Sequence, residues 1–96
     1  MTYQERFERQ IERFIERKKL SISIIQKEGH TSFKIAKQVF KEWRNYHDEI
    51  YWHNVIYEIG FMEDIPTPAR IMDEFKVSFY FANKLFEYYM EVCNGQ

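Results

Sequence analysis

The segment 21–46 constrains the fold more than any other part of the chain, because its apolar residues have the spacing of two consecutive helices. In its second part the apolar residues from Ile35 to Trp43 cover one side of a helix that turns by about 100° per residue. Gly29, His30 and Thr31 supply a short turn before this helix, and Ser32 stands where an N-cap residue is expected. The pattern predicts a short helix, a tight turn and a longer helix.

The remaining sequence is also typical of helices, with only three glycines and two prolines for turns. Segments with helical spacing cover residues 2–19, 22–29, 32–46, 48–61, 69–75 and 78–92. The alternating Ser and Ile residues at 20–25 also fit a β-strand, although the QKEG that follows favours a helix. We therefore expect an all-α fold with two tri-helical helix-turn-helix units in one compact domain, 1–96. The alternative is a winged helix-turn-helix.

An offset of 46 residues aligns the two halves of the chain, about 1–46 and 47–96. At this offset six positions are identical, pairing Ile25, Glu28, Ser32, Phe33, Ala36 and Phe40 with Ile71, Glu74, Ser78, Phe79, Ala82 and Phe86. Two interpretations are open: an internal duplication, or the recurrence of a generic helix-turn-helix pattern.

The net charge of −1 conceals a strong asymmetry between the halves. Residues 1–45 contain 11 Lys and Arg against 6 Asp and Glu, which gives +5, and residues 46–96 contain 3 against 9, which gives −6. The first half can approach a polyanion, and the second would be repelled by it. The same asymmetry would also allow molecules to associate head to tail.

A basic ridge follows the helix that begins near Ser32. It consists of Lys34, Lys37, Lys41 and Arg44, which lie within roughly 80° of one another on that helix. A cationic outer face on the second helix of such a unit is typical of proteins that bind nucleic acid through that helix. The alternative is a lysine-rich face that contacts only solvent. We predict that DNA is bound by Lys27, His30, Ser32, Lys34, Lys37, Gln38, Lys41 and Arg44.

In the second half the ridge positions carry Tyr80, Asn83, Glu87 and Met90, so the charge is lost there. These residues, with Tyr88, form a predicted interface for a protein partner or a homodimer: Tyr80, Asn83, Glu87, Tyr88 and Met90. Aromatic side chains of this kind also stack on the bases of single-stranded DNA, which is an alternative role for some of them.

The predicted first helix carries a row of arginines: Arg6, Arg9, Arg13 and Arg17. One interpretation is a solvated face with ion pairs to the adjacent glutamates of the same helix. The other is a contact with a phosphate backbone or an acidic partner. Thr2 followed by Glu5 has the pattern of a capping box at the start of this helix.

Several functional classes find no support in the sequence. Cys93 is the only cysteine, which excludes an internal disulfide and a cysteine-based zinc site and fits a cytoplasmic protein. The three histidines have no metal-binding spacing, and no catalytic motif is present. The charged N-terminus does not resemble a signal peptide, and no apolar run is long enough for a transmembrane helix. We expect a non-enzymatic protein without cofactor, metal or membrane association.

Segment 21–43 resembles the helix-turn-helix of the gamma domain of bacterial DNA translocases. The matching residues are Ser21, Ser23, Ile25, Gln26, Lys27, Ser32, Phe33, Ala36 and Val39, and residues 66–89 are similar in the same places. The resemblance implies a winged helix that binds duplex DNA through the helix from Ser32. A looser resemblance links the chain to small winged-helix proteins of Gram-positive mobile elements, some of which bind single-stranded DNA. No glycine-bounded β-wing follows Trp43, which departs from both patterns.

The sequence thus favours a small DNA-binding protein of a phage or other mobile element, with duplex DNA as the preferred ligand. Two alternatives remain open: a protein-binding adaptor or inhibitor on the same scaffold, and a single-stranded DNA-binding protein that uses aromatic stacking.

Overall fold

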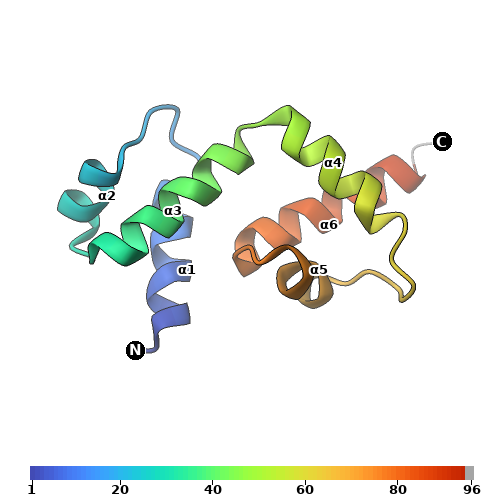
Figure 1. Cartoon of the computed structure of the whole chain (residues 1–96), viewed down its shortest axis with the longest axis horizontal. Coiled ribbons are helices and arrows are strands. Elements are labelled where there is room, and N and C mark those ends of the chain that lie inside the picture. The colour runs from blue at the N-terminus through green and yellow to red at the C-terminus, as the bar shows by residue number, and fades with distance from the viewer. Residues whose placement is uncertain (95–96) are drawn as a thin grey trace. The chain divides into compact units, whose positions relative to one another are not determined.

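The computed structural model describes residues 1–94, which form six helices and no strand (Figure 1). The helices are α1 (Tyr3–Phe14), α2 (Ile22–Gly29), α3 (Phe33–Tyr46), α4 (Glu49–Ile59), α5 (Pro68–Phe75) and α6 (Phe79–Asn94). The all-α prediction is confirmed. The strand considered for residues 20–25 is wrong, and residues 1–94 contain no β-wing such as the winged-helix alternative requires.

The chain divides into two compact units, Met1–His47 and Asp48 onward. In unit 1, α3 packs against both α1 and α2. The apolar residues at positions 7, 11, 14 and 15 follow helical spacing and are all buried, and residues of α2 and α3 complete this core: Phe7, Ile11, Phe14, Ile15, Ile25, Ile35, Ala36 and Val39. The apolar spacing therefore identified the inward faces of all three helices, because burial of one stripe per helix is what holds them together.

Side-chain caps fix where the helices of unit 1 begin. Thr2 and Glu5 form the predicted capping box, in which each side chain accepts a hydrogen bond from the other residue's backbone N–H. Ser21 accepts from the N–H of Ile24 at 3.1 Å, and Ser32 caps α3 in the same way. These bonds satisfy backbone donors that a helix start otherwise leaves unpaired.

The first helix ends earlier than predicted, at Phe14 rather than near Lys19. Two backbone carbonyl groups beyond Phe14 accept hydrogen bonds from side chains of α3 and of its C-cap residue, His47. Trp43 Nε1 donates to the carbonyl of Arg17 at 2.7 Å, and His47 Nε2 donates to that of Ile15 at 2.8 Å. These bonds from a distant part of the chain hold residues 15–17 as the start of the connection to α2.

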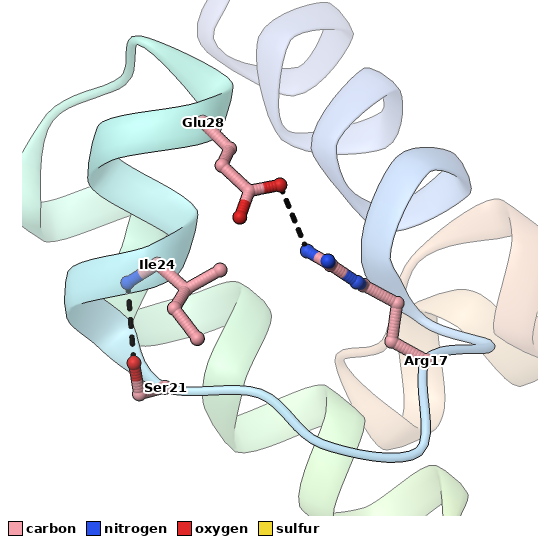
Figure 2. A network of polar contacts seen from close by, with 4 residues as sticks. All are labelled: Arg17, Ser21, Ile24 and Glu28. Atoms are coloured by element: carbon pink, nitrogen blue, oxygen red, sulfur yellow. Dashed lines mark hydrogen bonds and ion pairs between the residues drawn. The ribbon is translucent and has the colours of Figure 1, made fainter.

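The connection between α1 and α2 is further held by an ion pair at 3.0 Å between Arg17 and Glu28, which lies in the last turn of α2. Figure 2 shows the Arg17 guanidinium reaching across to Glu28, with the Ser21–Ile24 cap below it. Both side chains of the pair are nearly half exposed, so the pair itself contributes only about 0–1 kcal/mol.

The turn between α2 and α3 uses a left-handed residue. His30 has φ 48° and ψ 48°, and its N–H donates to the carbonyl of Gln26. A non-glycine residue is unfavourable in this conformation, although histidine adopts it more often than most residues. The turn reverses the chain within three residues and places Ser32 at the start of α3.

Unit 2 has the same order of elements. Here α6 packs against α5 and α4 around a core that consists of Val55, Ile59, Ile71, Val77, Phe81, Ala82 and Leu85. Its helices are capped by Asp48, Thr67 and Ser78, each of which directly precedes the first helical residue. Their side chains accept hydrogen bonds from backbone N–H groups two or three residues further along the chain.

The 46-residue offset seen in the sequence also relates the helix boundaries of the two units. α4, α5 and α6 begin 46 residues after α1, α2 and α3, respectively. The left-handed C-cap His30 of α2 corresponds to Lys76, which caps α5 with φ 55° and ψ 44°. The buried residues of α1 and α4 do not follow the 46-residue offset, however. Phe7 and Ile11 of α1 lie 48 residues before Val55 and Ile59, the buried residues of α4.

Candidate nucleic-acid interface

The basic ridge lies on the exposed side of α3, and Ile35, Ala36 and Val39 are buried on the other side. All four ridge cations are exposed. Three of them, Lys37, Lys41 and Arg44, form no ion pair, hydrogen bond or ring contact within residues 1–94. The helix thus holds three uncompensated positive charges on one side of unit 1.

The fourth ridge cation, Lys34, lies against an aromatic ring from α1. Its Nζ is 5.3 Å from the ring centroid of Tyr3, a cation–π contact, and the Tyr3 hydroxyl donates to Oε1 of Gln38. Because this oxygen is engaged, only the amide N–H groups of Gln38 are available to a ligand. Bidentate recognition of adenine needs the oxygen as well as an N–H group, so Gln38 cannot make it while bonded to Tyr3. Tyr3 could not be recognised from sequence patterns, because its contacts with Lys34 and Gln38 depend on how α1 packs against α3.

Phe33 adds an aromatic ring to the same side of α3. It is the first residue of the helix, is 57% exposed, and lies within about 40° of Lys37 and Arg44 around the helix axis. An exposed ring beside cations is suited to contact with a thymine methyl group or to stacking on an unpaired base. Phe33 is not among the eight residues predicted from sequence to bind DNA. Its exposure beside the ridge cations adds it to the candidate site.

The remaining predicted DNA-binding residues lie before α3 in the chain. Lys27 is exposed on α2, and His30 is exposed in the turn, where it lines a cleft with Thr31. The Ser32 hydroxyl oxygen accepts from the N–H of Ile35 at 3.3 Å, which leaves the hydroxyl proton available to a ligand. All eight predicted residues are therefore in unit 1, on α3 or in the α2 segment that leads to it.

The predicted partner interface in unit 2 is less exposed than the basic ridge. Glu87 and Met90 are exposed, but Tyr80, Asn83 and Tyr88 are half-buried. Tyr88 packs edge-to-face against Trp52 of α4 with ring centroids 5.6 Å apart, and Lys84 Nζ lies 5.6 Å from the Tyr80 ring centroid. These two rings therefore pack within unit 2.

Unit 2 instead exposes apolar residues of α4 and of the segment after it. Ile50 and Tyr57 lie within about 20° of each other on the side of α4 opposite Val55 and Ile59, and Phe61 is exposed in the turn that follows the helix. The rings of Tyr57 and Phe61 contact each other with centroids 4.9 Å apart. Sequence patterns did not single out these three residues, because apolar residues occur on more than one side of segment 48–61.

Within the described part of the chain, no cluster of His, Cys, Asp and Glu has the composition of a metal site. None of the helices described is both long enough and apolar enough to cross a bilayer. Comparison with protein-family models, curated proteins and solved structures found no match to this chain. The resemblance to the translocase gamma domain accordingly stays a prediction that rests on the quoted residues.

Proposed function

We propose that this protein is a small DNA-binding protein that contacts DNA through the basic ridge on α3. The observation that carries the proposal is the set of three exposed, unpaired cations, Lys37, Lys41 and Arg44, on one side of that helix. Lys18 and Lys19 are exposed and unpaired as well, so it is the alignment of these three cations on one side of the second helix that points to a ligand. Phosphates of a nucleic acid are polyanionic partners that this spacing along a helix can meet.

The arrangement around α3 also supports this function. A short helix, a tight left-handed turn and a capped longer helix with a buried inner face have the order of elements of a helix-turn-helix, in which the second helix enters the major groove, and this order supports the proposal. Phe33 at the start of α3 and the amide of Gln38 are available for base edges. The charge of +5 on residues 1–45 adds sequence-independent attraction.

Fluorescence anisotropy with labelled random duplex and single-stranded oligonucleotides at several salt concentrations tests the proposal. The matched variants are K37E/K41E and K18E/K19E, which change the charge of unit 1 equally. Lys18 and Lys19 are exposed outside α3 and have no ion pair within residues 1–94. We expect K37E/K41E to abolish binding and K18E/K19E to weaken it only modestly.

The salt dependence gives a second, quantitative readout. If both lysines neutralise phosphates of a duplex, K37Q/K41Q lowers the slope of log K against log salt by about 1.8, since each contact contributes about 0.9. Circular dichroism must show unchanged helix content in every variant. No binding of the wild type to either strand form at low salt, or equal losses in the two charge-reversal variants, contradicts the proposal.

A protein-binding adaptor is the second candidate function, and the exposed apolar side of α4 favours it. Ile50, Tyr57 and Phe61 form an apolar surface of the kind found at protein–protein contacts. The same titrations separate the candidates, because an adaptor without nucleic-acid function shows no salt-dependent DNA binding for the basic ridge to lose.

A further inference from the structure

Unit 1 contains a cleft with a markedly basic lining. Its volume is about 410 Å³, and it lies between α1 and the turn that precedes α3, lined by Met1, Arg6, Arg9, Gln10, His30 and Thr31. No lining residue carries a carboxylate, and neither arginine forms an ion pair within residues 1–94. The Arg6 guanidinium makes one long hydrogen bond, at 3.4 Å, to the carbonyl of Met1.

Glu5, a carboxylate whose pKa is influenced by Arg9, is already engaged elsewhere. The pKa of Glu5 is lowered mainly by hydrogen bonds from the backbone and side chain of Thr2. The positive charge of Arg9 makes a smaller contribution in the same direction. That carboxylate belongs to the capping box at the start of α1. Arg9 therefore retains donors for a ligand in the cleft.

Two local features build the cleft. Gln10 Nε2 donates to the carbonyl of Gly29 at 3.1 Å, and this bond joins the wall formed by α1 to the end of α2. Because Gly29 has no Cβ, the Gln10 side chain can approach it closely. The left-handed conformation of His30 then turns the chain so that His30 and Thr31 line the same cleft as the arginines.

We propose that this cleft is a binding site for a phosphate group. Arginine guanidinium groups bind phosphate oxygens with two parallel N–H donors, and the Thr31 hydroxyl and the His30 imidazole can donate to the remaining oxygens. The volume exceeds that of a phosphate alone, so the group can belong to a larger molecule. The cleft is also at the N-terminal end of α3, where the helix dipole favours an anion.

The phosphate has two candidate sources. It can be a backbone phosphate of DNA bound on α3, because Thr31 directly precedes the Ser32 cap, and in that case the site rests on the proposed function and extends the DNA contact onto α1. Figure 1 shows that the first turns of α1 and of α3 lie at the same end of unit 1, in agreement with the Lys34–Tyr3 contact. Alternatively, it can be a free phosphate ester, which does not require DNA binding.

The test for the site itself is a titration of the ¹⁵N-labelled protein with sodium phosphate, compared with sodium chloride at equal ionic strength. We expect saturable amide shifts at Gln10, His30 and Thr31 that chloride does not reproduce. R6Q/R9Q should weaken phosphate binding by at least about tenfold, since it removes charge-assisted hydrogen bonds. The matched control K18Q/K19Q removes equal charge outside the cleft and should retain binding. Non-saturable shifts, or equal weakening in both variants, overturn the proposal.

The test for the source is DNA titration of the same two variants. A larger loss of duplex affinity in R6Q/R9Q than in K18Q/K19Q, with a salt slope lower by about 1.8, identifies a backbone phosphate. Loss of phosphate binding with unchanged DNA binding identifies a free phosphate ester and leaves both proposals standing. Saturable phosphate binding in a wild type that binds no DNA supports the cleft and refutes the proposed function.

Discussion

Replacement of Gly29 by alanine tests the contact between α1 and α2 on which the cleft depends. Gly29 is the last residue of α2, and its surroundings leave no room for a side chain. A Cβ built there lies 2.3 Å from Gln10 Oε1 and 3.1 Å from both Gln10 Cδ and Phe14 Cε2. The glycine is therefore required by close approach, since its φ is not positive.

The sign of the effect depends on which of three contributions is largest. Alanine is favoured over glycine inside a helix by about 1 kcal/mol. Moving Gln10 away breaks its hydrogen bond to the Gly29 carbonyl, worth about 0.5–1.5 kcal/mol, so these two contributions nearly cancel. What remains is the overpacking against Phe14, which is only 1% exposed and cannot move freely, and such overpacking costs about 1–3 kcal/mol. We expect G29A to destabilise unit 1 by about 1–2 kcal/mol.

Urea unfolding measures this effect, with Trp43 as the reporter of unit 1 in a W52F background that removes the other tryptophan, from unit 2. G60A is the matched control, followed through Trp52 of unit 2 in a W43F background, because Gly60 has φ −61° and its nearest neighbours are the carbonyl oxygens of Tyr57 and Ile56 at 3.3 and 3.8 Å. It should change stability by no more than about 0.5 kcal/mol. In a Q10A background the destabilisation caused by G29A should fall by about 0.5–1.5 kcal/mol, because Q10A has already removed the Gln10–Gly29 hydrogen bond. If G29A is as stable as the parent protein, or if G29A destabilises unit 1 equally with and without Q10A, the reasoning is refuted.

Two further predictions concern the backbone and the pH dependence of stability. His30→Gly and Lys76→Gly should each stabilise their own unit by about 1 kcal/mol, because glycine adopts the left-handed C-cap conformation without steric conflict, and unchanged urea midpoints would contradict this. The backbone N–H and the hydroxyl of Thr2 hold the pKa of Glu5 below its ordinary value. The capping box therefore stabilises α1 above the ordinary glutamate pKa, and this contribution is lost as the pH falls through the lowered folded-state pKa. E5Q should remove this part of the acid destabilisation of unit 1, and an identical acid limit in E5Q and wild type would argue against it.

Local chemistry made much of the fold predictable. The caps Thr2, Ser21, Ser32 and Thr67 act on backbone groups three residues away, so their positions can be recognised from sequence alone. The buried faces follow from helical periodicity in the same way. Neither signal depends on where another helix lies.

Features that depend on contacts between helices were not predictable from these patterns. Residues 15–19 carry good helix-forming side chains, yet α1 stops at Phe14, and His47 and Trp43 satisfy the carbonyls of Ile15 and Arg17 in place of helical N–H groups. The cleft escaped prediction for a related reason. Arg6 and Arg9 were recognised as part of a row on one helix, but only the tertiary fold places His30 beside them.

The comparison of α3 with α6 indicates what the proposed function depends on. Both helices begin with a serine cap and an exposed phenylalanine, follow a left-handed turn and bury their next residues in a core. α6, however, carries a single cation, Lys84, and it lies over the Tyr80 ring. If this scaffold alone conferred DNA binding, the acidic unit 2 would bind as well. The proposal therefore assigns the function to the uncompensated side chains of α3, which is where charge reversal can refute it without disturbing the scaffold.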